Sequence, residues 1–168
     1  MCEVIKTNRL ILRPFVPTDA PRVVEILGQY AVSKWLSSVP HPFSAPDLKI
    51  FDPDSPRVWP NFMAVALGDT LIGAVNNKPQ LVYWFAPEAH GNGYATEAVT
   101  AVCDFVFHVQ KRAEVLSGYY ADNAASERVL QKCGFRETHR GAQFSRARNE
   151  TRPHVWVRQT AEQWGGRS

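Results

Sequence analysis

His90-Gly91-Asn92-Gly93-Tyr94-Ala95-Thr96-Glu97-Ala98 is the stretch that decides the fold of this chain. It follows an apolar run, 81–86, which Pro87 closes, and it opens a segment, 95–106, whose apolar residues recur at helical spacing. A strand, a turn of small residues and a helix N-terminus together form an anion site. The unpaired amides of the first helical turn point at the ligand, and the helix dipole adds a favourable potential. The stretch therefore predicts a phosphorylated ligand.

Three phosphate-binding patterns compete for this turn. A P-loop ends in Gly-Lys-Ser/Thr, and the turn contains no lysine. A dinucleotide fingerprint needs a small residue at the position of Thr96 and an acidic residue at the tip of the next strand, whereas Glu114 precedes that strand. The third pattern is Gln/Arg-x-x-Gly-x-Gly/Ala. Gly93 and Ala95 match it, with His90 at its first position.

A second segment, 122–135, distinguishes these patterns. It resembles the Asn-x-x-Ser-x-x-Val-Leu-x-x-x-Gly-Phe motif of the Gcn5-related N-acetyltransferase (GNAT) superfamily, through Asn123, Ser126, Val129-Leu130 and Gly134-Phe135. The third pattern of the turn is the pyrophosphate loop of the same superfamily. Both motifs stand in the right order, with one strand between them. The alternative is that the glycines only form a tight turn and Asn123 only caps a helix.

The resemblance is to the RimJ/RimL-type branch and covers nearly the whole chain. It runs from Thr7-Asn8-Arg9-Leu10-Ile11-Leu12-Arg13-Pro14 to Val155-Trp156-Val157. It implies a GNAT fold of the α/β (α+β) class, in which the central strands splay apart. The order of strand and helix patterns itself predicts helices around a mixed, mostly antiparallel sheet of about six to seven strands. The length of 168 residues suits a single N-acetyltransferase domain over 1–168.

Composition is ordinary for a soluble protein, with 45% hydrophobic and 21% charged residues and a formal charge of +3. No apolar run approaches membrane-spanning length, and the start has no signal-peptide pattern. Cys2, Cys103 and Cys133 are widely spaced and show no metal-ligand pattern, so we expect no metal site and place Cys103 and Cys133 in the core. These features favour the cytoplasm. Nucleic acid and membrane are not expected partners.

The resemblance implies acetyl-CoA as cofactor, and it implies where acetyl-CoA binds. The pantetheine arm would add to the strand that Pro87 ends, on amides freed where the neighbouring strand splays away. The Phe85 amide would face the thioester oxygen. The glycine turn would hold the pyrophosphate, and Asn123 would bond the arm from across the cleft. The cofactor-binding residues are therefore Trp84, Phe85, Ala86, Gly91, Asn92, Gly93, Tyr94, Ala95, Thr96 and Asn123.

The catalytic acid of many relatives is a tyrosine just before the Gly-Phe motif, and Leu130 occupies that position here. Ser126 is the substitute that the RimJ/RimL-type branch suggests; its alternative role is to bond nearby backbone at a helix start. Relatives often carry a glutamate that acts as the general base where this chain has Gln80, which cannot accept a proton at neutral pH. The residues that could act as general base instead of a glutamate are Tyr83, Glu88, Tyr119 and His154, and none of these four stand-ins is favoured.

The sequence therefore predicts direct transfer of acetyl from acetyl-CoA to a primary amine, either a protein N-terminus or a small molecule. One rival is a module that binds acyl-CoA without turnover; another is a nucleotide-dependent enzyme. The acceptor and the oligomeric state stay open, although dimers are common among similar proteins. The proline-rich segment Ser37 to Pro60 is either a binding loop or a connector. The arginines of the last third would steer an acidic partner or simply lie scattered on the surface.

Overall fold

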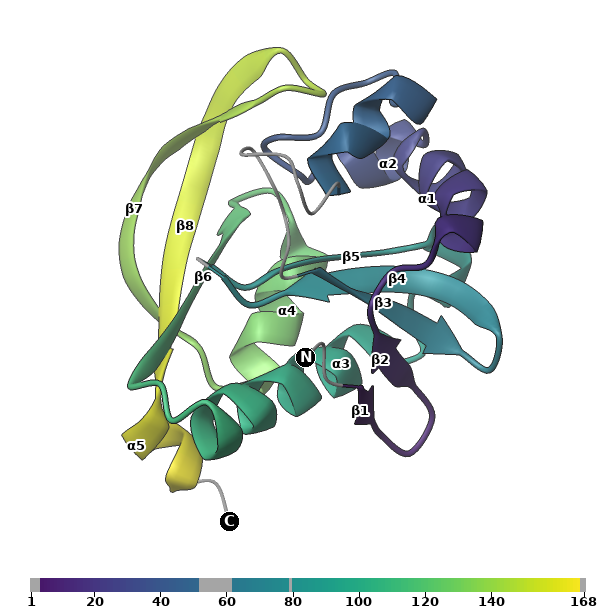
Figure 1. Cartoon of the computed structure of the whole chain (residues 1–168). Coiled ribbons are helices and arrows are strands. Elements are labelled where there is room, and N and C mark those ends of the chain that lie inside the picture. The colour runs from purple at the N-terminus through teal and green to yellow at the C-terminus, as the bar shows by residue number, and fades with distance from the viewer. Residues whose placement is uncertain (1–3, 52–61, 79, 167–168) are drawn as a thin grey trace.

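The computed structural model describes residues 4–51, 62–78 and 80–166 of the chain. It contains a five-stranded antiparallel sheet of order β1-β2-β3-β4-β5 and a three-stranded antiparallel sheet of order β6-β8-β7 (Figure 1). The strands are β1 (Ile5–Lys6), β2 (Ile11–Arg13), β3 (Phe62–Leu67), β4 (Thr70–Asn76), β5 (Val82–Phe85), β6 (Glu114–Tyr120), β7 (Arg136–Ser145) and β8 (Glu150–Thr160). The predicted class and the mostly antiparallel pairing are confirmed, but the strands of the described residues form two sheets rather than one sheet of about six to seven strands.

Helices cover both faces of the five-stranded sheet, with α1 and α2 above it and α3 below it in Figure 1. They are α1 (Ala20–Leu27), α2 (Tyr30–Ser33), α3 (Tyr94–Asp104), α4 (Ala124–Lys132) and α5 (Ala161–Gly165). A π-helical turn, Phe105–Val109, extends α3, so the apolar spacing that predicted a helix as far as residue 106 continues through it. Helix α4 begins two residues before Ser126 because Asn123 caps it.

Two hydrophobic clusters fill the two faces of this sheet. The cluster on the α3 side contains Val99, Val102 and Leu130, and the cluster on the α1 side contains Val23 and Ile26. Successive residues of a strand face opposite sides, so β5 contributes to both. Tyr83 and Phe85 pack with the first cluster, and Val82 and Trp84 pack with the second. Cys103 and Cys133 are fully buried in the first cluster, as predicted.

Part of the proline-rich segment packs into the fold. Val39 and Phe43 are buried in the cluster on the α1 side, and a 3-10 helix spans Ala45–Phe51. The remainder, 52–60, lies outside the described residues, so the role of the segment as a binding loop stays a prediction. In the described part of the chain no helix combines the length and the apolar character that crossing a membrane requires.

An ion pair closes the first turn of the fold between β2 and α1. Arg13 donates from Nη1 to Asp19 Oδ2 at 2.7 Å and from Nη2 to Asp19 Oδ1 at 2.9 Å. The Val16 amide donates to the same Oδ2 at 2.9 Å. The Asp19 side chain is 7% exposed. Burial alone would raise the pKa of Asp19, but the bonds from Arg13 and Val16 hold that pKa below its usual value.

We predict that Asp19→Asn lowers the free energy of unfolding by about 2 kcal/mol, because Arg13 would keep a half-buried charge without its partner. Urea denaturation at pH 7 measures this loss. Since the folded pKa of Asp19 is lowered, its contribution is present above the unfolded pKa of about 3.9 and disappears as the pH falls through the folded pKa. The difference from wild type should therefore shrink below about pH 4. Asp69→Asn, in the exposed β3–β4 turn, is the control and should cost less than about 0.5 kcal/mol.

Candidate active site

Among the described residues, the two sheets meet at a single parallel bridge between Leu81, just before β5, and Ser117 of β6. The Leu81 amide donates to Leu116 O at 2.7 Å, and Ser117 Oγ donates to Leu81 O at 2.8 Å. Ser117 is 1% exposed, so water does not compete for this bond. Beyond the bridge β5 and β6 belong to separate sheets, and the strands diverge as the resemblance implied.

A cavity of about 410 Å³ opens between the diverging strands. Its walls come from β5, β6, α2 and the residues after it, the glycine turn, the first turn of α3 and the length of α4. Of the predicted site residues, the following line it: Trp84, Phe85, Gly91, Gly93, Tyr94, Ala95, Thr96, Asn123 and Ser126. Ala86 and Asn92 are the two predicted residues that do not line the cavity, although both lie in the described part of the chain. The fold thus gathers two motifs that are about 30 residues apart in sequence.

The glycine turn has the backbone that an anion site requires. Gly91 and Gly93 have φ angles of +79° and +80°, which side-chain-bearing residues rarely adopt. A Cβ on Gly91 would meet nothing within 4 Å, so conformation rather than crowding by protein requires glycine there. Gly93 ends the turn as the residue before α3, and its carbonyl accepts from the Glu97 amide at 3.0 Å. The amides of the first helical turn are consequently available beside the cavity.

Asn92 shapes the turn instead of lining the cavity. Its Nδ2 donates to the His90 carbonyl at 3.0 Å. The His90 ring in turn bonds the Phe85 carbonyl through Nε2 at 3.1 Å, so His90 ties the turn to the end of β5. His90 lines the cavity, at the position where the family pattern has glutamine or arginine.

The main chain of β5 departs from the expectation of three free amides. The Ala86 amide donates to Ile72 O of β4 at 2.8 Å, so it is engaged inside the sheet. In an antiparallel pair the amides of alternate residues point to the same neighbouring strand. Trp84 lies two residues before Ala86 and pairs with Ala74 of β4. The Trp84 amide therefore points to β4 as well. Phe85 lies between the two in register, so of these three amides its own faces the open edge.

Ser126 is paired with a tyrosine that the sequence did not connect to it. Tyr83 Oη lies 2.7 Å from Ser126 Oγ, so β5 touches α4 across the cavity floor. Burial raises the pKa of the Tyr83 phenol well above its usual value. Tyr83 is therefore protonated at neutral pH. Asn123 Oδ1 accepts from the Ser126 amide at 3.1 Å, which leaves the Nδ2 of Asn123 as its donor toward the cavity.

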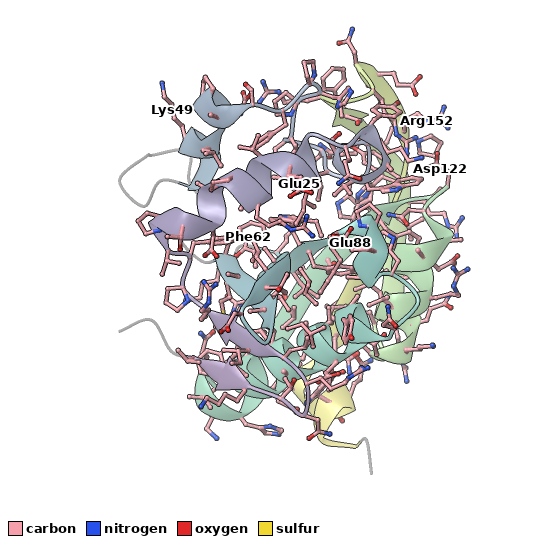
Figure 2. All side chains as sticks on the ribbon, turned by 90° about the vertical axis from the view of Figure 1, so that its right-hand side faces the viewer. Glu25, Lys49, Phe62, Glu88, Asp122 and Arg152 are labelled. Carbon is pink, nitrogen blue, oxygen red and sulfur yellow. The ribbon has the colours of Figure 1, made fainter. Side chains whose placement is uncertain are left out.

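None of the four stand-ins for a general base has the properties of one. Burial raises the pKa of Tyr119, which donates to Glu127 Oε1 at 3.3 Å, and Tyr83 is protonated too. Glu88 is bound to Arg22 of α1, and Figure 2 shows it beside that helix, at the end of β5. Burial lowers the pKa of His154, and the neighbouring His139 lowers it further. The His154 ring, however, packs against Gly118 and does not line the cavity.

The α2 wall of the cavity is held by the turn between β7 and β8. Arg148 donates from Nε to Lys34 O at 3.1 Å and from Nη1 to Asp122 Oδ2 at 2.7 Å, and its side chain is only 7% exposed. Its guanidinium also lies 4.6 Å from the ring centre of Trp35, which lines the cavity. Arg152 reaches Asp122 too, and Figure 2 shows these two side chains together. Arg148 therefore fixes the aromatic part of this wall.

The sequence matches a known protein family and several named proteins. Residues 9–136 match the sequence model of the "Acetyltransferase (GNAT) domain" family. The chain is 26% identical over 151 residues to "Putative ribosomal N-acetyltransferase YdaF" of Bacillus subtilis, an alignment that covers 81% of each protein. It is also 37% identical to "Probable N-acetyltransferase YjcK" of the same bacterium, over 42% of this chain and 44% of that protein.

Solved structures share the fold. The GNAT-family acetyltransferase of Bacillus anthracis superposes with a TM-score of 0.83 at 22% identity, covering 95% of this chain and 99% of that one. The RimL acetyltransferase of ribosomal protein L7/L12, in complex with CoA, superposes with a TM-score of 0.77 at 14% identity, covering 94% and 98%. At these identities the superpositions establish the fold.

We predict that Ser117→Ala weakens the junction of the two sheets, because the buried Leu81 carbonyl would lose its hydroxyl donor. The free energy of unfolding should fall by about 1–3 kcal/mol, measured by urea denaturation. Thr138→Ala is the matched control. Its hydroxyl also donates to a carbonyl, that of Trp156 at 3.2 Å, but at an exposed position where water can replace it. Equal losses in the two variants would contradict a special role for the bridge.

Proposed function

The chain belongs to the GNAT acetyltransferase family, and from that premise we propose that it transfers acetyl from acetyl-CoA directly to a primary amine. The family makes the chain an acetyltransferase that uses acetyl-CoA as donor. The observation that carries the proposal for this site is the cavity between β5 and β6, which joins an open strand edge to the glycine turn. Acetyl-CoA supplies an activated acetyl thioester. The residues of this chain bind it, orient it and place a hydroxyl near its sulfur.

The glycine turn and α3 would hold the pyrophosphate through the amides of Gly91 to Thr96, helped by the dipole of an eleven-residue helix. The Phe85 amide would bind along the pantetheine arm at the edge of β5, as an added strand does. Asn123 Nδ2 would bond the arm from the opposite wall. Trp84 would contribute its side chain rather than its amide, and Ala86 and Asn92 would support the walls from behind.

Ser126 would act as the hydrogen-bond donor to the leaving sulfur. Either hydroxyl can donate in the bond between Tyr83 Oη and Ser126 Oγ, and when the phenol donates, the serine proton is free to point into the cavity. The pKa of a thiol is about 8.5, so the sulfur needs only partial stabilisation at neutral pH. The attacking amine has a pKa of about 8 when it is an α-amine, so a fraction of it is neutral without a side-chain base.

The acceptor that we propose is an N-terminal amine of a protein, with small-molecule amines as the alternative. The similarity to a chain named a ribosomal N-acetyltransferase supports a peptide acceptor. The α2 wall offers it an apolar surface, through Ala31, Val32, Trp35 and Leu36. We further propose that residues 1–168 form one catalytic domain that works in the cytoplasm, where its buried thiols, Cys103 and Cys133, stay reduced.

A thermal shift with acetyl-CoA, beside NAD and ATP at equal concentration, tests the cofactor site. Acetyl-CoA at a hundredfold its dissociation constant should add about 2.7 kcal/mol, which raises the Tm of a domain of this size by roughly 5–10 °C. Gly93→Val should abolish this shift, because a β-branched residue resists a φ of +80° and the turn that presents the amides would distort. The control is Gly68→Val in the β3–β4 turn, which also has a positive φ and open surroundings. Both variants should lose similar stability, and only Gly68→Val should keep the shift. A shift that survives in Gly93→Val would remove the pyrophosphate from this turn.

Steady-state kinetics test the proposed role of the Ser126 hydroxyl as donor to the leaving sulfur. Ser126→Ala should lower kcat by about 10- to 100-fold while the KM for acetyl-CoA stays within about threefold, because the bond to sulfur matters only as the thioester breaks. Tyr83→Phe should lower kcat less, by about fivefold, because it releases the serine proton from its fixed direction. Turnover of Ser126→Ala at the wild-type level across pH would exclude Ser126 from the reaction.

A further inference from the structure

The turn between β1 and β2 is fastened to the first turn of α3. Thr7 Oγ1 donates to Glu97 Oε1 at 2.5 Å, and the Arg9 amide donates to the same oxygen at 3.0 Å. Arg9 Nε donates to the other oxygen, Oε2, at 2.7 Å, and Arg9 Nη2 lies 2.6 Å from it. One carboxylate thus gathers four contacts from a segment about 90 residues away in sequence.

Arg9 also contacts the glycine turn itself. Its Nη1 donates to the Asn92 carbonyl at 3.0 Å, and its guanidinium lies 4.6 Å from the ring centre of Tyr94. Its Nη2 would lie 3.6 Å from a Cβ on Gly93. The side chain therefore contacts Asn92 and Tyr94, the residues on either side of Gly93, where the turn ends and α3 begins.

The charge of Glu97 is the reason that this contact matters for ligand binding. Glu97 lies in the first turn of α3, where a carboxylate favours the helix but repels a second anion at the same helix end. Burial alone would raise the pKa of Glu97, but the bonds from Thr7 and Arg9 bring that pKa below its usual value. Glu97 is therefore negative at neutral pH, with its side chain only 17% exposed. The Arg9 guanidinium cancels this charge within contact distance.

We propose that Arg9 is a positioning residue for the pyrophosphate. It fixes the end of the glycine turn and neutralises Glu97, so that the negative charge of Glu97 does not repel an anion bound at the amides of the first helical turn. This inference rests on the proposed binding of acetyl-CoA at the turn. Arg9 itself does not line the cavity. Its effect should appear in the affinity for donors that carry a pyrophosphate and not in the transfer step.

The turn that carries Arg9 does not depend on Arg9 for its fold. The Thr7 amide donates to Leu10 O at 3.0 Å, and the Leu10 amide donates to Thr7 Oγ1 at 2.9 Å. Leu10 and Leu12 are buried in the core at 1% and 0% exposure, whereas the Arg9 side chain is 45% exposed. A substitution of Arg9 should therefore remove its contacts to α3 and leave the turn in place.

The test compares two acetyl donors in Arg9→Met. S-acetylpantetheine carries the same thioester and arm as acetyl-CoA but lacks the pyrophosphate and the adenosine. We expect the KM for acetyl-CoA to rise about tenfold with kcat within twofold, and the KM for S-acetylpantetheine to stay unchanged; a tenfold change corresponds to 1.4 kcal/mol. Glu97→Gln added to Arg9→Met should recover most of the lost affinity, because it removes the charge that Arg9 cancels. Arg140→Met, which breaks an exposed Arg–Glu pair on β7, is the control and should change neither KM.

Two results overturn the proposal. One is an unchanged KM for acetyl-CoA in Arg9→Met, and the other is an equal rise for both donors, which would make Arg9 a merely structural residue. Should Arg9→Met fail to fold, Arg9→Lys keeps the charge but loses the planar fork, and we expect a rise of about threefold for acetyl-CoA alone. A wild-type protein that binds no acetyl-CoA would overturn the proposed function and this inference with it. An active wild type with an unresponsive Arg9→Met would overturn this inference alone.

Discussion

The bridge between Leu81 and Ser117 is the constraint on which the rest of the structure depends. It joins two sheets at one point and lets them twist independently beyond it, because strands that share a single bridge share no ladder. The separation is kept open from the other side by α4, where Ser126 meets Tyr83 of β5 at 2.7 Å. Pro87 then ends β5, since a residue without an amide proton cannot continue the ladder. A cavity between main chains follows from these three features together.

An open strand edge is usually a liability, because unpaired main-chain groups attract further strands. Here that edge lies at the base of a cavity whose walls are α2 and α4, so only a narrow ligand reaches it. The glycine turn lies at the same end of β5, tied to it by the bond between His90 and the Phe85 carbonyl. Strand edge and anion site are thus fixed relative to each other by a connection of a few residues. That spacing suits one long ligand with a phosphorylated end.

The local features of the site could be predicted from sequence, and its long-range contacts could not. The glycine turn and the strand before it depend on neighbouring residues, and the structure has both where the pattern put them, whereas α4 begins earlier than Ser126, behind its cap Asn123. The engagement of the Ala86 amide depends on which residues of β5 bond β4, and a shift of one residue would reverse it. The partners of Glu97 and Ser126 come from segments distant in the chain, and Glu97 alone looked like an ordinary acidic residue of a first helical turn. The stretch around Thr7 and Arg9 was visible only as part of a family resemblance.

Most arginines of β7, β8 and the turn between them are engaged with carboxylates or backbone carbonyls, and this limits what they can recognise. Arg148 and Arg152 share Asp122, Arg140 pairs with Glu137, and Arg146 donates to the Ser38 carbonyl. Arg146 and Arg148 in particular hold the β7–β8 turn against the segment that follows α2. The apolar wall that this turn fixes in place is one surface that the acceptor would meet, with Lys34 and Arg148 both over the Trp35 ring. Selectivity for an amine would then come from the shape of this wall and from how closely it brings the amine to the thioester, rather than from paired charges or a side-chain base.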